Sequence, residues 1–148
     1  MTLEELYKAI NAKMQKIREY AGFEGVSVEN EDNDDKIKRP SIRVLIEDYT
    51  SERVNFCGII HTASPGIYYF SKNEDFSNEE NIKMQEILEE LFIDGVEIGL
   101  AAIEPERLEF KKEPGMLYCK LSNMKHTIYA AEETGEPMED VKLDMEGE

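Results

Sequence analysis

Four carboxylates gather between residues 74 and 80, where acidic side chains could bind a metal ion or act as a general acid and base. They are Glu74, Asp75, Glu79 and Glu80. A calcium loop needs alternating Asp or Asn ligands, a glycine at its sixth position and a glutamate at its twelfth, and this segment lacks that arrangement. Ser77 and Glu80 instead have the S-x-x-E spacing of a capping box, whose side chains accept from the free amides of a first helical turn. The patch therefore predicts the beginning of a helix.

Two cysteines and two histidines are the other candidate metal ligands. They are Cys57, His61, Cys119 and His126. On a regular strand, Cys57 and His61 would lie about 13 Å apart at ~3.3 Å per residue, too far to share one zinc ion. Cys119 and His126 are separated by an odd number of residues and fall on opposite faces of a regular strand, although a bulge would restore the parity. The pattern favours two buried thiols and two ordinary histidines, and we expect no metal site.

Motifs of nucleophilic catalysis and of phosphate binding are missing from the sequence. It contains no G-x-S-x-G elbow, no G-x-x-x-x-G-K-[ST] loop and no G-x-G-x-x-G. Carboxylates are plentiful, but a general acid–base pair must be held facing a pocket, and most of these carboxylates fall in predicted loops or on polar helix faces. We therefore expect no catalysis. A small cytoplasmic enzyme with an unrecognised pocket is the alternative of a different class.

The charge balance limits the class of partner. The 148 residues include 33 Asp and Glu against 17 Lys and Arg, a formal net charge of −16. So acidic a chain repels nucleic acids and anionic membranes, and we expect no specific nucleic-acid binding and no membrane association. No signal peptide and no apolar run of ~18 residues is recognisable, and two free cysteines without such a signal suit a reducing cytoplasm.

Two amphipathic helices are predicted from the spacing of apolar residues. Apolar residues recur at spacings of three and four from Leu3 to Ile17 and from Met84 to Phe92. Thr2 and Glu5 have capping-box spacing at the first helix, and Gly22 is a plausible stop. These segments predict one helix near the beginning of the chain and one in its second half.

Strands are predicted around and between the helices. Alternating or strongly apolar runs occur at residues 26–28, 41–48, 54–62, 67–70, 107–111 and 116–130. The Pro-Gly pairs at 65–66 and 114–115 fit type II turns, and Tyr49–Ser51 is a candidate turn after the second run. Residues 54–70 are either two hairpin strands or one long, kinked strand, and 116–130 are one strand or a strand with a bulge.

The order of these elements predicts the fold class. Helix, strands, helix and strands in succession favour an α+β fold, with a mainly antiparallel sheet and two amphipathic helices on one face. We expect residues 1–130 to form a single domain and residues 131–148 an acidic C-terminal tail.

Two features indicate partners. Ile82 points away from the apolar stripe of its helix, which makes it either an isolated surface isoleucine or part of a contact. The run 54–62 carries apolar residues of both parities, so its strand is either covered on both sides or exposes one face to another subunit.

Three stretches resemble the small tail terminator (tail completion) proteins of bacteriophages and phage-tail-like particles. They follow a capped N-terminal helix and read RPSIRVLIEDYTSER, IYYFSKNEDFSNEENIKMQEILEELF and LEFKKEPGMLYCKLSNMKHTIY. Most characteristic is a strand ending in Tyr69-Phe70, followed by a short acidic loop and an amphipathic helix. A late hairpin with its turn at Gly115 adds to the resemblance, which covers roughly residues 2–129. The stretch FCGIIHTASPG is longer than the family pattern leads us to expect, which leaves the strand layout of residues 53–70 open.

The resemblance implies a structural subunit without cofactor or chemistry. Such subunits assemble into a homo-oligomeric ring, typically a hexamer, that caps the last ring of the tail tube and stops its polymerisation. The implied partners are copies of itself, the tail tube protein, and sheath or neck proteins. The implied location is the bacterial host cytoplasm during assembly and then the virion or tail-like particle. A neck or collar protein, or a head–tail connector, is the alternative assignment.

Five residues are candidates for contacts between subunits or with the tube. Under the resemblance, we expect these contacts at hairpin residues and at strand residues: Arg53, Asn55, Phe56, Phe110 and Tyr118.

Overall fold

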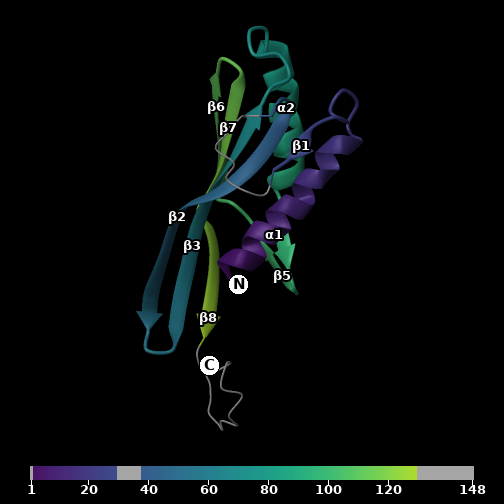
Figure 1. Ribbon diagram of the computed structural model, residues 1–148. Coiled ribbons are helices and arrows are strands. Elements are labelled where there is room, and N and C mark those ends of the chain that lie inside the picture. Colours follow the sequence, from purple (N-terminus) through teal and green to yellow (C-terminus); the bar gives the residue numbers. More distant parts are fainter. Residues whose placement is uncertain (1, 30–37, 130–148) are drawn as a thin grey trace.

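The computed structural model describes residues 2–29 and 38–129 (Figure 1). In chain order its elements are α1 (Leu3–Met14), the 3-10 helix η1 (Gln15–Glu19), β1 (Ser27–Val28), β2 (Ser41–Asn55), β3 (Gly58–Phe70), α2 (Asn78–Phe92), β4 (Val96–Ile98), β5 (Ala101–Ile103), β6 (Arg107–Glu113), β7 (Met116–Ser122) and β8 (Met124–Tyr129). The predicted residues 131–148 of the acidic tail lie outside the described residues. No helix in the described ranges is long and apolar enough to cross a membrane.

Both predicted helices are present, and the capping box of the first is confirmed. Thr2 Oγ1 accepts from the Glu5 amide at 3.1 Å, and Glu5 Oε1 accepts from the Thr2 amide at 2.8 Å. The regular helix is shorter than its apolar stripe, because η1 takes over after Met14. Gly22, the predicted stop, has φ of 91° in the turn that follows η1.

The main sheet has the order β1-β2-β3-β7-β6, and β8 also pairs with β3. Every pairing in it is antiparallel except β1 with β2. β7 and β8 lie along the same side of β3 and are separated only by Asn123, whose φ is 57°. Asparagine tolerates this left-handed conformation better than most residues. The stretch 116–129 is therefore a strand interrupted by one residue, close to the predicted strand with a bulge.

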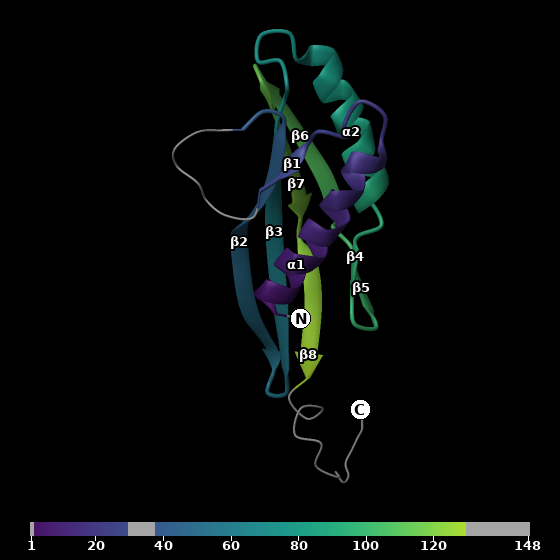
Figure 2. The same ribbon diagram turned by 45° about the vertical axis from the view of Figure 1, so that its right-hand side comes forward.

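One face of the sheet carries both helices, as predicted, and the core lies between these layers (Figure 2). The α+β prediction is thus confirmed. The side chains that fill this space are fully buried, and the largest are Leu6, Ile10, Met14, Ile17, Ile42, Ile67, Tyr69, Met84, Leu88, Phe92, Leu117 and Leu121. Burial of these apolar stripes supplies most of the stability of helices as short as α1 and α2.

The predicted turn at Tyr49–Ser51 is wrong, because β2 continues through it to Asn55 and the chain reverses at Phe56-Cys57. Pro65-Gly66 is not a turn either. It lies inside β3, which is the long-strand alternative.

Pro65 is accommodated because both neighbouring strands are irregular beside it. β2 has a bulge between Ile46 and Asp48, and the break at Asn123 separates β7 from β8. A proline in a regular central strand would remove a ladder hydrogen bond, so proline is confined to edges and to bulges such as this one. By contrast, Pro114-Gly115 does form the predicted turn between β6 and β7, with φ of 77° at Gly115.

Candidate assembly surfaces

A long extension of the sheet projects past the beginning of α1 (Figure 1). We call it the arm and define it as residues 48–62 of β2 and β3 together with β8. It is three strands wide, with β3 in the middle, paired to β2 on one side and to β8 on the other. Ile59 and Ile60 point to opposite faces of the arm and both are half-exposed. The run 54–62 is therefore not covered on both sides, and that alternative from the sequence analysis does not hold.

The tip of the arm brings together three of the predicted contact residues: Arg53, Asn55 and Phe56. Asn55 Oδ1 accepts from the Cys57 amide at 2.9 Å and from Cys57 Sγ at 3.2 Å, which closes the turn. Phe56 makes little packing contact with the described part of the chain, since the residue is 91% exposed. Isolated exposed apolar residues are common, but a large aromatic ring at the end of a projecting arm is placed for a partner.

The metal ligands considered from the sequence do not converge. Cys57 lies at the arm tip and Cys119 in the core, where burial raises the pKa of the Cys119 thiol to about 12. His61 and His126 face each other across β3 and β8, and His61 Nδ1 is 2.9 Å from the Tyr49 hydroxyl. The described residues contain no group of three or more His, Cys, Asp or Glu side chains placed to hold a metal ion.

The face of the sheet opposite the helices, here called the open face, contains a polar cluster around Glu47. The hydroxyls of Tyr68 and Tyr118 both donate to its carboxylate, and the two phenol rings lie 4.9 Å apart between centroids. Burial, and then the hydrogen bond to Glu47, raises the pKa of Tyr68 to about 12, and the pKa of Tyr118 rises for the same reasons. Tyr118, a predicted contact residue, is therefore a half-buried part of this cluster.

Phe110 lies on the opposite face of the sheet from Tyr118. It pairs with Cys119, whose side chain is in the core, and the Phe110 ring packs half-buried against that core. Adjacent residues of a strand alternate between faces, so the two predicted strand residues do not share a surface.

The acidic patch begins α2, as predicted, but by a different set of contacts. The predicted second capping box is wrong, because the Ser77 side chain makes no bond to its own helix. Ser77 Oγ instead accepts from the buried amide of Gly115 at 3.0 Å. The Glu80 carboxylate accepts from the Tyr69 hydroxyl and, at 2.7 Å, from the Lys72 amide. These residues tie the helix to the sheet and to the β6–β7 turn.

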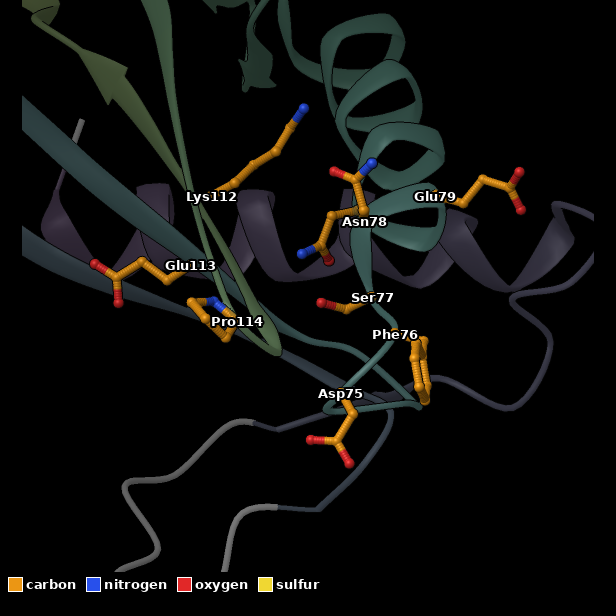
Figure 3. A pocket seen from close by; sticks show the side chains of 9 residues that line it. Asp75, Phe76, Ser77, Asn78, Glu79, Lys112, Glu113 and Pro114 are labelled. Carbon is orange, nitrogen blue, oxygen red and sulfur yellow. The ribbon is translucent and has the colours of Figure 1, made fainter.

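A depression of about 650 Å³ lies beside the beginning of α2. The loop before α2, its first turn and the β6–β7 turn line it, with Asp75, Phe76, Glu79, Lys112 and Glu113 among its residues (Figure 3). In this view Lys112, Glu113 and Glu79 point in three different directions. Polar groups that converge on one point, as a catalytic pocket requires, are not found here.

A family model described as phage tail terminator protein matches residues 5–135. The match runs from α1 past the end of β8 and covers most of the chain. The chain belongs to the phage tail terminator family. A comparison with curated proteins found no match.

A tail terminator is a structural component of the virion that ends the tail tube, and it is not an enzyme. The resemblance noted from the sequence is therefore confirmed at the level of the family.

The contact residues predicted for this tail terminator occupy three separate regions: the arm tip, the open face with Tyr118, and the helix-covered face with Phe110. Arg53 pairs with Ile59 in β3, whereas Tyr118 pairs with Tyr68. Ile59 and Tyr68 are nine positions apart in β3, which corresponds to roughly 30 Å at ~3.3 Å per residue. The tip and the open face are thus distinct surfaces.

Sequence reasoning missed Glu47 and Tyr68, which share the open face with Tyr118. The alternation in 41–48 suggested a regular strand, and a one-residue bulge leaves no signal in such a pattern. The sequence did contain a signal for this contact. A hairpin that pairs the run 41–48 with the run 67–70 would place the tyrosines of the second run near the acidic end of the first.

Proposed function

We propose that this tail terminator assembles into a closed ring, typically of six copies, on the last ring of the tail tube and stops its growth. The arm tip with Arg53, Asn55 and Phe56 is its contact with the tube end. The observation that carries this proposal is the 91% exposure of Phe56 at the end of a projecting arm. The phenyl group of Phe56 is not part of the core, so its burial is available to an interface.

Such a ring works by geometry alone. An interface between two different surfaces of the same subunit, repeated around a rotation axis, closes when the rotation closes. One end of the ring then fits the tube, and the other end lacks what a further tube subunit needs. The net charge of −16 suits a passage through which DNA slides without sticking.

The two ends of the subunit suggest which partner binds at each end. The arm tip is at one end, and the loop before α2 with the β6–β7 turn is at the other (Figures 1 and 2). With the tip on the tube, the opposite end faces the neck or sheath. Assembly takes place in the host cytoplasm, and the ring then stays in the virion or tail-like particle. Phe110 and Tyr118 remain predicted subunit contacts.

The test compares Phe56→Asp with Phe76→Asp. Phe76 is 82% exposed at the opposite end, so both variants place a charge on an exposed aromatic position and neither disturbs the core. Purified variants are mixed with growing tail tubes, and binding and tube length are followed by light scattering and electron microscopy. We expect F56D to leave the tubes uncapped and F76D to cap them like the unmodified protein.

Three results would contradict parts of this proposal. If F56D caps tubes normally, the tip is not the tube contact. If neither variant nor the unmodified protein associates with tube ends, the terminating ring itself is wrong. If electron microscopy places the protein in the neck, away from the tube end, the neck or collar alternative applies.

A further inference from the structure

Each of the two long sides of the arm has a strand edge that is unpaired among the described strands. Among the described strands, β2 pairs along Asp48–Arg53 only with β3, because the pairing of β1 with β2 ends at Ile42. β8 also pairs only with β3 among the described strands, and β5 lies close to it without joining its sheet. Unpaired edges expose amide and carbonyl groups that readily accept another strand.

The direction of the two edge strands determines how copies can meet. β2 and β8 are both antiparallel to β3, so they run parallel to each other. In a ring built by rotation, every copy keeps the same orientation along the axis. β8 of one copy then meets β2 of the next copy in parallel, whereas a two-fold pairing of two β2 edges would be antiparallel.

Charges on the open face of the two edges are complementary. On β2, this face carries every second residue of the edge: Asp48, Thr50 and Glu52. On β8 it carries Lys125, because Lys125 and Thr50 both pair with Thr62 of β3. Without stagger, Lys125 of one copy would lie level with Thr50 of the next, between the carboxylates of Asp48 and Glu52. Opposite charges at such cross-strand and diagonal positions stabilise a pairing, and like charges disfavour β2 against β2.

We propose that β8 of each copy adds as a parallel strand to β2 of its neighbour, so that the arms join into one continuous closed sheet. This inference rests on the ring proposed above and names the contact that closes it. The occupant of each edge is a second copy, because the same arm supplies both complementary edges.

A disulfide test separates contacts between copies from contacts within one chain. Thr50 and Lys125 both pair with Thr62, from opposite sides, so their Cα atoms are about two strand spacings, or ~9.5 Å, apart. A disulfide requires Cα atoms within about 7 Å, so cysteines at these positions can bond only between copies. The background is Cys57→Ser, and Cys119 stays in place because its thiol is buried with a raised pKa.

The expected result for T50C/K125C under mild oxidation is a ladder of linked oligomers that ends at one size, the ring. T50C and K125C alone should stay unlinked. The pair T50C/T127C covers a stagger of two residues. A second measurement uses hydrogen–deuterium exchange of the unmodified protein. The fast-exchanging amides within residues 48–53 and 125–129 should become protected when the ring forms.

The outcomes against the inference are distinct from those against the ring. Dimers from T50C alone would show two-fold pairing of β2 edges and overturn it. Rings seen by light scattering without cross-linking by either pair, and without exchange protection at the edges, would also overturn it while leaving the proposed function intact. Absence of any ring in the presence of tubes would overturn both.

Discussion

The carboxylate of Glu47 lies directly over the α-carbon of Gly66. A methyl group added at Gly66 would come within 2.5 Å of Glu47 Oε1 and 2.8 Å of Tyr118 Cε1. Glu47 falls at the bulge between Ile46 and Asp48, and glycine in the facing strand leaves the room that its side chain occupies. The bulge, the glycine and the two tyrosine hydrogen bonds to Glu47 therefore form one unit.

Gly66→Ala should destabilise the protein by ~1–3 kcal/mol, because the new methyl group displaces Glu47 and the Tyr118 ring from their contact. Gly25→Ala is the matched control, since nothing lies within 4 Å of a methyl group there. Urea unfolding followed by circular dichroism measures both free energies of unfolding. Equal stability of the two variants would show that Gly66 is not needed for this packing.

The stability of the fold should fall as pH rises from 10.0 to about 12. Burial and the hydrogen bond to Glu47 raise the pKa of Tyr68 from its ordinary value of 10.0 to about 12 in the folded protein. Below that pH range the phenol is neutral in both states, and within it only the unfolded chain loses the proton, which favours unfolding. Tyr69 and Tyr118 have pKa values raised in the same direction and add to the loss. Tyr68→Phe removes one titrating group, so its urea midpoint should fall less steeply with pH. A slope equal to that of the unmodified protein would contradict the assignment.

Ser77→Ala should cost ~1–3 kcal/mol, because it leaves the buried Gly115 amide without its acceptor. Ser51→Ala, at an exposed position of β2, controls for the substitution itself and should change stability by less than ~0.5 kcal/mol. Thermal unfolding of both variants checks this. A harmless Ser77→Ala would mean that water or a shift of the turn replaces the hydroxyl.

Leu88→Ala should destabilise the fold by ~2–5 kcal/mol, since Leu88 is fully buried where α2 packs on the sheet. Ile82→Ala on the same helix is the control. Ile82 is 40% exposed, as its position opposite the apolar stripe predicts, and should cost far less. Comparable losses in denaturant unfolding would place Ile82 in a contact that the isolated subunit does not show.

Periodicity predicted the helices because Leu6, Ile10, Met84 and Leu88 repeat with the helix turn, and each faces the sheet. The same local pattern identified the strands of the body. It failed at Tyr49–Ser51 and at Pro65-Gly66, where residues typical of turns lie in strands. In both places the pairing with a distant strand outweighs the local preference.

The positions of the predicted contact residues follow from the sequence only in part. Arg53, Asn55 and Phe56 are neighbours in sequence, so any hairpin keeps them together. Phe110 and Tyr118 come from two paired strands, and the face that each occupies depends on a register that the sequence does not specify. The hydrogen bond from Gly115 to Ser77 joins segments 38 residues apart and has no local signal.

β3 runs without interruption from Gly58 beside the arm tip to Phe70 at the far end of the sheet. At that far end Tyr69 is hydrogen-bonded to Glu80 of α2. A single strand thus connects the arm tip to the end of the subunit at which α2 begins. In the ring proposed above, a displacement of the arm tip would be transmitted along β3 to the opposite end of the subunit.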